Sequence, residues 1–149
     1  MKIRPVILCG GAGTRLWPKG SNHQAKQFID FGGWTLINKT FERIKNNIYD
    51  YPIISTNAKY IKEVKKALKK SKIKKFKIIL EPAKKNTAPA IAIAALKALE
   101  NDQDSILLVL SSDHEIKDPS NFRKAVEFGL NDAENDKLVT FGIKPEYPE

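Results

Sequence analysis

The sequence predicts an α/β fold, with a doubly wound, Rossmann-like and mostly parallel sheet that carries helices on both faces. Two patterns indicate this class: short β-branched runs alternate with longer helical patterns, and the short runs are apolar at odd and even positions alike. Strands that are apolar on both faces are typical of a parallel sheet covered by helices, joined by right-handed crossovers. A third observation agrees with it, because glycine and polar residues gather directly after several of these runs, where such sheets bind ligands.

Five runs are predicted to be strands because each is short and rich in β-branched or other apolar residues; they span residues 3–9, 51–56, 76–80, 105–110 and 138–143. Between them, apolar residues at helical spacing predict helices over 35–46, 58–70, 88–100 and 119–131. Asp118 followed by Pro119 reads as an N-cap with proline at the first helical position. Asn86 or Thr87 is able to cap the third helix in the same way.

The length and composition indicate one domain, 1–149, in a cytoplasmic protein. A chain of 149 residues with 42% hydrophobic residues is long enough to bury a core. Cys9 is the single cysteine, which excludes an intramolecular disulfide, and its apolar setting predicts a buried, reduced thiol. The longest apolar stretch, 88–96, is far below the roughly 20 residues that cross a bilayer, so no membrane partner is expected.

The net charge of +9 is concentrated in residues 59–85, where 12 lysines stand against two acidic residues. Such an island is able to attract a polyanion. Within it, however, Ile61, Val64 and Leu68 recur at helical spacing with lysines on the other side, which favours a solvated helix face. Since no aromatic residues are interleaved for base stacking, we expect no nucleic-acid partner.

A glycine-rich loop, CGGAGTRLWPKG, follows the first predicted strand. Gly10, Gly11 and Gly13 permit positive φ and let a phosphate approach backbone N–H groups, while Thr14 and Arg15 add a hydroxyl and a guanidinium fork. The spacing excludes the GxxxxGK[ST] loop, and it fails the GxGxxG pattern because a leucine stands at the third glycine position. A phosphate cradle is the favoured interpretation, and a turn that needs glycine only for tight packing is the alternative.

The loop is one of several motifs that carry a family resemblance: VILCGGAGTRLWP, KQF, EPAKKNTAPAIAIAAL, LVLSSDHEI and TFGIKPEYPE. In this order they resemble the N-terminal part of mannose-1-phosphate guanylyltransferases, within the sugar-nucleotidyltransferase superfamily. The resemblance implies a truncated nucleotide-diphospho-sugar transferase fold, the N-terminal half of a longer catalytic domain. It implies transfer of GMP from GTP to mannose 1-phosphate, giving GDP-mannose and pyrophosphate.

By the same resemblance, specific residues acquire expected roles. Arg15, Lys26 and Asp113 are expected to be catalytic, with Asp113 also holding Mg²⁺, the expected cofactor. The triphosphate is expected to lie on the glycine-rich loop, with Arg15 beside the departing pyrophosphate. The full set expected to bind the nucleotide is Gly10, Gly11, Gly13, Thr14, Arg15, Glu81, Asn86 and Thr87.

Glu81 is the candidate reader of guanine because one carboxylate can accept from both N1–H and the exocyclic amine, with Asn86 and Thr87 adding polar contacts. Three alternatives stay open: Glu81 as an ion-pair partner of nearby lysines, Lys26 as a surface lysine, and Asp113 as a turn cap. For the chain as a whole, the alternative is a catalytically inactive relative that binds nucleotide or a partner. A homo-oligomer, or association with a missing C-terminal half, is the expected assembly.

Overall fold

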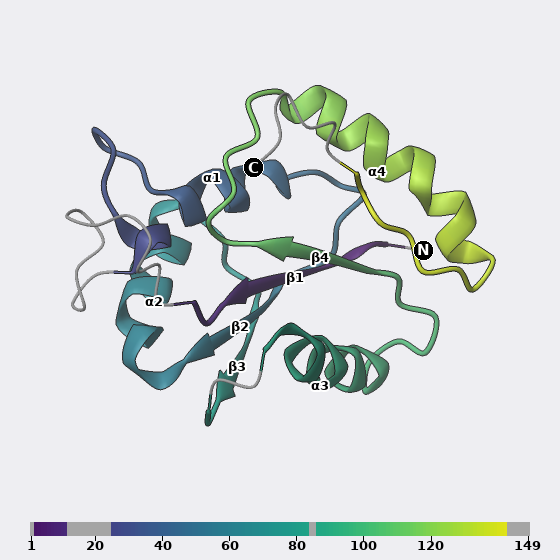
Figure 1. The fold of residues 1–149 in the computed structure, drawn as a ribbon, viewed down its shortest axis with the longest axis horizontal. Coiled ribbons are helices and arrows are strands. Elements are labelled where there is room, and N and C mark those ends of the chain that lie inside the picture. Colours follow the sequence, from purple (N-terminus) through teal and green to yellow (C-terminus); the bar gives the residue numbers. More distant parts are fainter. Residues whose placement is uncertain (1, 12–24, 84–85, 143–149) are drawn as a thin grey trace, which may run out of the picture. The chain divides into compact units, whose positions relative to one another are not determined.

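A computed structural model of the chain describes residues 2–11, 25–83 and 86–142 (Figure 1). The chain divides into two compact units, Met1–Glu115 and Ile116–Glu149, so the single domain remains a prediction. All four strands described below belong to the first unit.

The sheet has four parallel strands in the order β3-β2-β1-β4. They are β1 (Arg4–Cys9), β2 (Ile53–Asn57), β3 (Lys77–Glu81) and β4 (Leu107–Ser111). The central strand β1 is apolar on both faces and largely buried, and Ile7 lies in register with Ile54 on one side and Leu110 on the other. The α/β class and its parallel sheet are thus confirmed.

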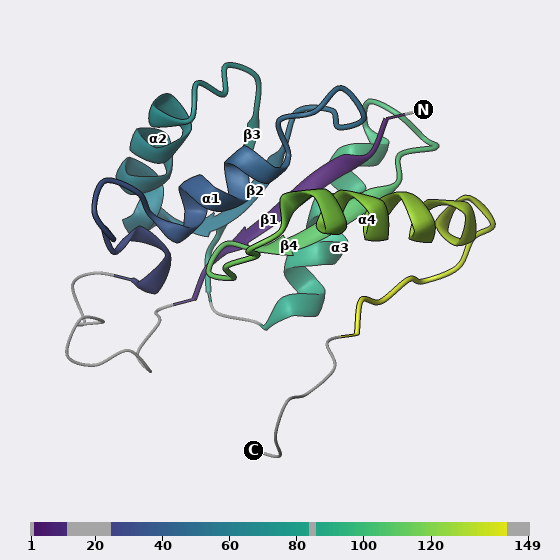
Figure 2. The ribbon, with the colours of Figure 1, turned by 90° about the horizontal axis from the view of Figure 1, so that it is seen from above.

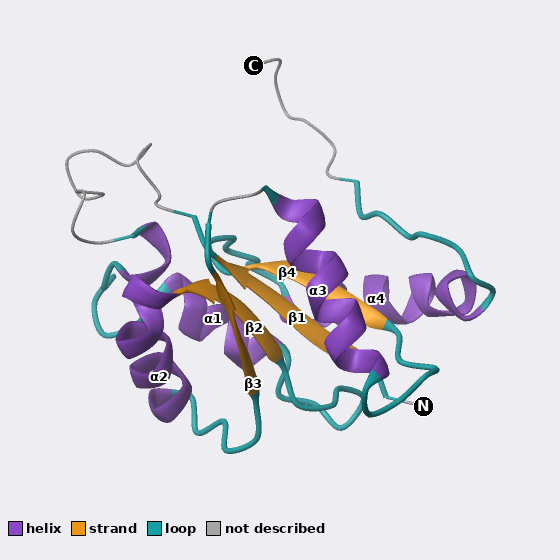
Figure 3. Cartoon of the chain, turned by 90° about the horizontal axis from the view of Figure 1, so that it is seen from below, coloured by secondary structure: helices purple, strands orange, loops and turns teal. Residues whose placement is uncertain are grey.

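Helices cover both faces of this sheet. On one face lie α1 (Leu36–Arg43) and α2 (Ile61–Lys70), each preceded by a short 3₁₀ helix, η2 (Lys26–Phe28) and η3 (Ala58–Tyr60). On the opposite face lies α3 (Thr87–Leu99), as the views from above (Figure 2) and from below (Figure 3) show. The predicted first helix is shorter than expected, and the second begins as a 3₁₀ turn.

Small side chains let α3 approach the sheet closely. Ala90, Ala94 and Ala98 recur every four residues and are buried, and two of them join Val6 and Ile53 in one apolar cluster. A stripe of alanines brings the helix backbone close to the strands, so the first turn of α3 is held near the carboxyl ends of β1 and β3.

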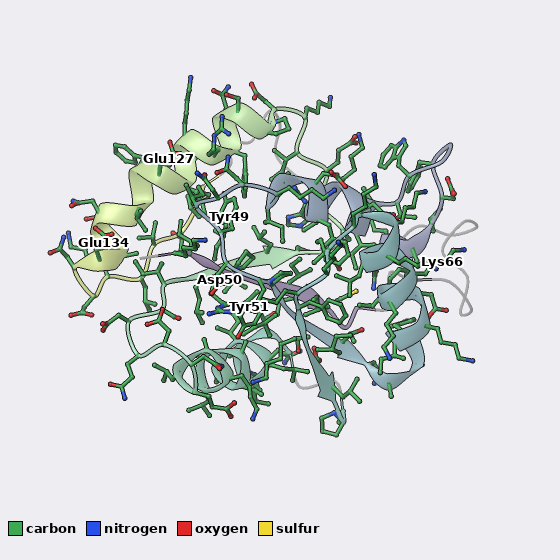
Figure 4. The ribbon with its side chains drawn as sticks, turned by 180° about the vertical axis from the view of Figure 1, so that it is seen from behind. Tyr49, Asp50, Tyr51, Lys66, Glu127 and Glu134 are labelled. Atoms are coloured by element: carbon green, nitrogen blue, oxygen red, sulfur yellow. The ribbon has the colours of Figure 1, made fainter. Side chains whose placement is uncertain are left out.

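The lysine-rich helix α2 is amphipathic, as the sequence predicts. Val64 and Leu68 are buried, whereas Lys65 and Lys69 are exposed, and Lys66 lies on the side of α2 that faces away from the sheet (Figure 4). The Asn38 side chain fixes α1 to this helix, because its Nδ2 donates to the Ala67 carbonyl at 3.0 Å and to the Ser71 hydroxyl at 2.8 Å.

At the amino end of the sheet a buried arginine joins β1 to the segment before β2. Arg4 is 3% exposed, its guanidinium pairs with the Asp50 carboxylate at 2.7 Å, and it lies 3.9 Å from the centre of the Tyr51 ring. Asp50 and Tyr51 lie close together in Figure 4. This ion pair stabilises the amino end of the sheet. Ligands of such sheets bind at the other end, beyond the carboxyl ends of the strands.

The second unit contains α4 (Pro119–Glu134). Asp118 caps it as predicted, accepting from the backbone N–H groups of Ser120 and Asn121 at 2.9 Å each. The strand predicted over 138–143 is wrong for 138–142, which form no strand; Ile143 lies outside the described residues. An apolar run becomes a strand only when a neighbouring strand accepts from its N–H groups and donates to its C=O groups, and composition does not reveal that neighbour. Among the described residues, no helix has the length and apolar character needed to cross a bilayer.

Candidate functional site

The strand order creates a cleft at the carboxyl ends of the strands. The chain runs from β1 outward to β2 and β3, and β4 then lies on the other side of β1, so the direction of winding changes between β1 and β4. Ligands of open α/β sheets bind at such a switch point. A cleft of about 470 Å³ lies here. Six residues singled out in the sequence line it: Gly10, Gly11, Glu81, Asn86, Thr87 and Asp113.

Glu81, the last residue of β3, is held by β2. Its Oε1 accepts from the Ser55 hydroxyl at 2.7 Å, and its backbone carbonyl accepts from Asn57 Nδ2 at 3.4 Å. None of the ion pairs among the described residues involves Glu81. Lys84 and Lys85 lie outside the described residues, so a lysine partner for Glu81 stays an open alternative. Among the described residues, the carboxylate is therefore held at the cleft by one uncharged donor, the Ser55 hydroxyl.

Asp113 follows β4 on the other side of β1 and is half-buried. Its Oδ1 accepts a short hydrogen bond from the Ser111 hydroxyl, and its Oδ2 lies 3.8 Å from Lys26 Nζ. Lys26 begins η2, and its side chain is 31% exposed. A lysine and an aspartate that come from segments 87 residues apart thus face each other beside the cleft. The proximity of Lys26 and Asp113 favours a shared role at the cleft over two separate roles as surface residues.

The donor set at Asp113 fits a hard divalent cation such as Mg²⁺. A carboxylate with a free acceptor position is a ligand that Mg²⁺ prefers, and this ion takes most of its shell from water and phosphate oxygens. No cluster of three or more His, Cys, Asp or Glu side chains suited to a metal occurs in the described part of the chain. A single carboxylate therefore suits a metal ion that enters the site bound to a phosphate. It suits less well a metal ion that protein ligands alone would hold.

The N-terminus of α3 faces the same cleft. Thr87 and Ala90, in its first turn, line the cleft, and the unpaired N–H groups there favour an anion. Asn86 occupies the N-cap position but makes no capping side-chain hydrogen bond, so the predicted cap is not formed by Asn86. Its φ of 62° and ψ of −168° fall in a region that side chains rarely adopt, and such strain gathers at ligand sites.

Gln27 connects η2 to the glycine-rich segment. It is 2% exposed, and its Nε2 donates to the Gly11 carbonyl at 3.2 Å and lies 3.7 Å from Cys9 Sγ. Because Gln27 follows Lys26 directly, one amide links the position of that lysine to the start of the glycine-rich loop. Cys9 is fully buried, as predicted, and burial raises the pKa of its thiol to about 11.

Arg43 supports the loop that carries Asp113. From the last turn of α1, its Nη2 donates to the His114 carbonyl at 3.1 Å and to the Thr40 hydroxyl. Thr40 in turn donates to the Ser111 carbonyl at 3.5 Å. Burial lowers the pKa of the Arg43 guanidinium. The backbone on both sides of Asp113 is thus tied to α1.

Three predicted site residues, Gly13, Thr14 and Arg15, lie outside the described residues, so their positions stay predictions. Sequence reasoning gave no role to Ser55 or Arg43, and it used Gln27 only as part of the KQF motif. Two of them carry a signal that was available: Ser55 is a hydroxyl in an apolar strand, and Gln27 is a polar residue between the lysine expected to be catalytic and a phenylalanine.

A parallel sheet with a cleft at its switch point and a helix N-terminus facing it places the chain in the class of α/β proteins with a ligand cleft suited to an anion, an arrangement that nucleotide-binding proteins share. Comparison with known families agrees: the Nucleotidyl transferase family matches residues 4–149, and the chain belongs to this family.

Within the family, the chain is 41–43% identical to mannose-1-phosphate guanylyltransferases over nearly its whole length. The enzyme of that name from Salmonella montevideo is 43% identical over 148 residues, which cover 99% of this chain and 31% of the relative. The xanthan biosynthesis protein XanB of Xanthomonas campestris is 43% identical over 99% of this chain and 32% of its own length. The chain thus spans about a third of the length of these curated relatives.

Solved structures resemble the fold as well. A crystal structure of mannose-6-phosphate isomerase from Helicobacter pylori matches with a TM-score of 0.80 and 31% sequence identity. The match covers 100% of this chain and 54% of that one. The described fold is therefore one part of a larger structure in that protein.

Proposed function

We propose that this chain is the GTP-binding part of a mannose-1-phosphate guanylyltransferase, which transfers GMP from GTP to mannose 1-phosphate and releases pyrophosphate. The observation that carries the proposal is the cleft in which Glu81, the first turn of α3 and the Lys26–Asp113 pair meet. Its size suits a nucleotide. We also propose that the protein acts in the cytoplasm.

The reaction requires charge neutralisation more than proton transfer. An oxygen of mannose 1-phosphate attacks the α-phosphorus of GTP, the new P–O bond forms, and the bond to the β-phosphate oxygen breaks as pyrophosphate leaves. The nucleophile is already an anion, so the barrier falls when cations and N–H groups surround the phosphates. Lys26 and the N–H groups at the start of α3 supply such charge here, and Arg15 is expected to add to it.

Mg²⁺ would be held by Asp113, with phosphate oxygens and water completing its shell, and it would neutralise the triphosphate there. Ser111 and Arg43 keep this carboxylate and its loop in place. Lys26 Nζ lies 3.8 Å from Asp113 Oδ2. When the nucleotide binds, this ammonium group would pair with a phosphate in place of the carboxylate.

The base would lie against Leu8, Gly10 and Ala90, with Glu81 at its edge. A carboxylate accepts from guanine N1–H and its exocyclic amine, whereas adenine offers no such pair of donors on that edge. We therefore expect Glu81→Gln to reduce the preference for GTP over ATP. An unchanged preference would show that another group reads the base.

Two experiments on the 149-residue chain test the proposal. Equilibrium binding should detect GTP in the presence of Mg²⁺, and failure to bind GTP would overturn the proposal. Pyrophosphate release with GTP and mannose 1-phosphate then separates the active enzyme from the alternative, a catalytically inactive nucleotide-binding relative. The share of the relatives that the chain covers favours binding without turnover by this segment alone.

A further inference from the structure

Ser55 is a buried hydroxyl on the apolar side of β2 that faces α3. It is completely inaccessible, and by the alternation of the strand it shares its face with Ile53, which packs in the cluster beneath α3. A buried hydroxyl costs free energy unless it is hydrogen-bonded. Its partner is Oε1 of Glu81, at 2.7 Å. Ser55 does not line the cleft, so any effect on a ligand would pass through Glu81.

Gly10 restrains the same carboxylate from the other side. A Cβ atom built on Gly10 would lie 2.9 Å from Glu81 Oε2, which real Cβ atoms essentially never do, and a tight 3.1 Å from Oε1. The carboxylate thus lies against the backbone of Gly10 while the Ser55 hydroxyl holds one of its oxygens. Together with the hydrogen bond from Asn57 to the Glu81 carbonyl, these contacts restrain both the backbone and the side chain of Glu81.

We propose that Ser55 is a positioning residue for nucleobase specificity, acting by aiming the Glu81 carboxylate at the base. The inference rests on the proposed function, in which Glu81 reads guanine. A carboxylate has about four lone-pair sites, and the serine hydroxyl uses one of them on Oε1. Oε2 and the remaining site on Oε1 are left for two parallel N–H donors. Without Ser55, the carboxylate rotates about its terminal torsion and presents this pair only part of the time.

The test compares the affinities of GTP, ITP and ATP, each with Mg²⁺, for the wild-type chain, Ser55→Ala, Glu81→Gln and the double variant. ITP lacks the exocyclic amine of guanine, so it reports that one contact. A net hydrogen bond is worth about 1 kcal/mol, so we expect Ser55→Ala to reduce the GTP-to-ATP affinity ratio about threefold to tenfold. The GTP-to-ITP ratio should fall as well. In the Glu81→Gln background, Ser55→Ala should change these ratios much less, because the carboxylate is already gone.

Thr56→Val is the matched control. Thr56 is the next residue of β2, is equally buried and also makes a hydroxyl hydrogen bond, to the Cys9 carbonyl at 3.1 Å, but it lies on the opposite face of the sheet. This variant should lose similar stability and keep its GTP-to-ATP ratio. Ser55→Cys, with a similar volume and a weaker donor, should give an intermediate ratio, and it serves as the test should Ser55→Ala fail to fold.

The outcomes separate the two proposals. If Glu81→Gln lowers the ratio and Ser55→Ala leaves it unchanged, the role of Ser55 is wrong while the proposed function stands. The role of Ser55 is also wrong if Thr56→Val lowers the ratio as much as Ser55→Ala. If the wild-type chain shows no preference for GTP, or Glu81→Gln keeps it, the reading of guanine by Glu81 fails first, and the role of Ser55 fails with it.

Discussion

Cys9 ends β1 beneath the glycine-rich segment, and its thiol has no access to solvent. Burial raises its pKa from the ordinary 9.0 to about 11. A group with a raised folded-state pKa holds its proton more tightly in the folded protein, so its contribution is fully present below pH 9 and is lost as the pH rises toward 11.

We therefore expect the free energy of unfolding to fall between about pH 9 and pH 11 more steeply in the wild-type chain than in Cys9→Ala. The difference between the two slopes should integrate to on the order of 2 kcal/mol at most. Denaturant titrations across this range measure it. Parallel slopes would mean that the thiol is not buried as described. Because both proteins contain the same lysines, the effect of lysine titration on stability cancels when the two slopes are compared.

At the same scale, the acidic and glycine positions of the cleft were predictable from sequence, whereas their supports were not. Glu81 stands directly after an apolar run and Asp113 follows one after two serines, and a residue near a strand end is easy to recognise. Ser55 is 26 positions from its partner, and its hydroxyl in an apolar run does not reveal which carboxylate it contacts. Side-chain partners depend on strand order, which local patterns do not contain.

Among the elements, η2 is the one that joins the proposed chemistry to the glycine-rich segment. It carries Lys26 toward Asp113 and buries Gln27, whose amide holds the Gly11 carbonyl. This short helix has three residues and no capping side-chain hydrogen bond at its start, so tertiary contacts rather than local propensity determine its position.

We expect Gln27→Met, which keeps the length but loses the amide, to weaken GTP binding about threefold to tenfold because one hydrogen bond no longer holds the glycine-rich segment. Calorimetric titration gives the affinity, and thermal unfolding gives the stability of the same sample. Gln27→Glu should be worse, since a carboxylate would face the Gly11 carbonyl. A lowered melting temperature with unchanged affinity would assign Gln27 to packing alone.

The elements themselves were predicted well where the pattern was local and poorly where it was not. The lysine face of α2 was predicted because its apolar residues repeat at helical spacing. The alanine stripe that buries α3 was not singled out, and the larger Ile93 and Leu96, which looked like core residues, are exposed. The run over 138–142 has strand-like composition yet forms no strand, because strand formation needs a partner edge. The N-cap of α3 was also misjudged for Asn86, whose backbone takes a strained conformation instead.

For the molecule as a whole, strand order is what assembles the cleft. Residues at the ends of β1, β3 and β4 are far apart in sequence, and the order β3-β2-β1-β4 brings their carboxyl ends to one edge. Five of the twelve lysines in residues 59–85 lie on α2, and the cleft has carboxylates on two sides. A highly charged anion should therefore bind here more tightly together with a divalent cation, which makes Mg²⁺ dependence the central expectation.

The most direct measurement of this expectation is the affinity of GTP for the wild-type chain and for Asp113→Asn, with and without Mg²⁺, by calorimetric titration. Mg²⁺ should strengthen GTP binding at least tenfold in the wild type and much less in Asp113→Asn, because the amide is a poorer ligand for a hard cation. Thermal unfolding checks that both proteins are folded. Equal enhancement by Mg²⁺ in the two proteins would contradict the role of Asp113 and the metal-bridged cleft.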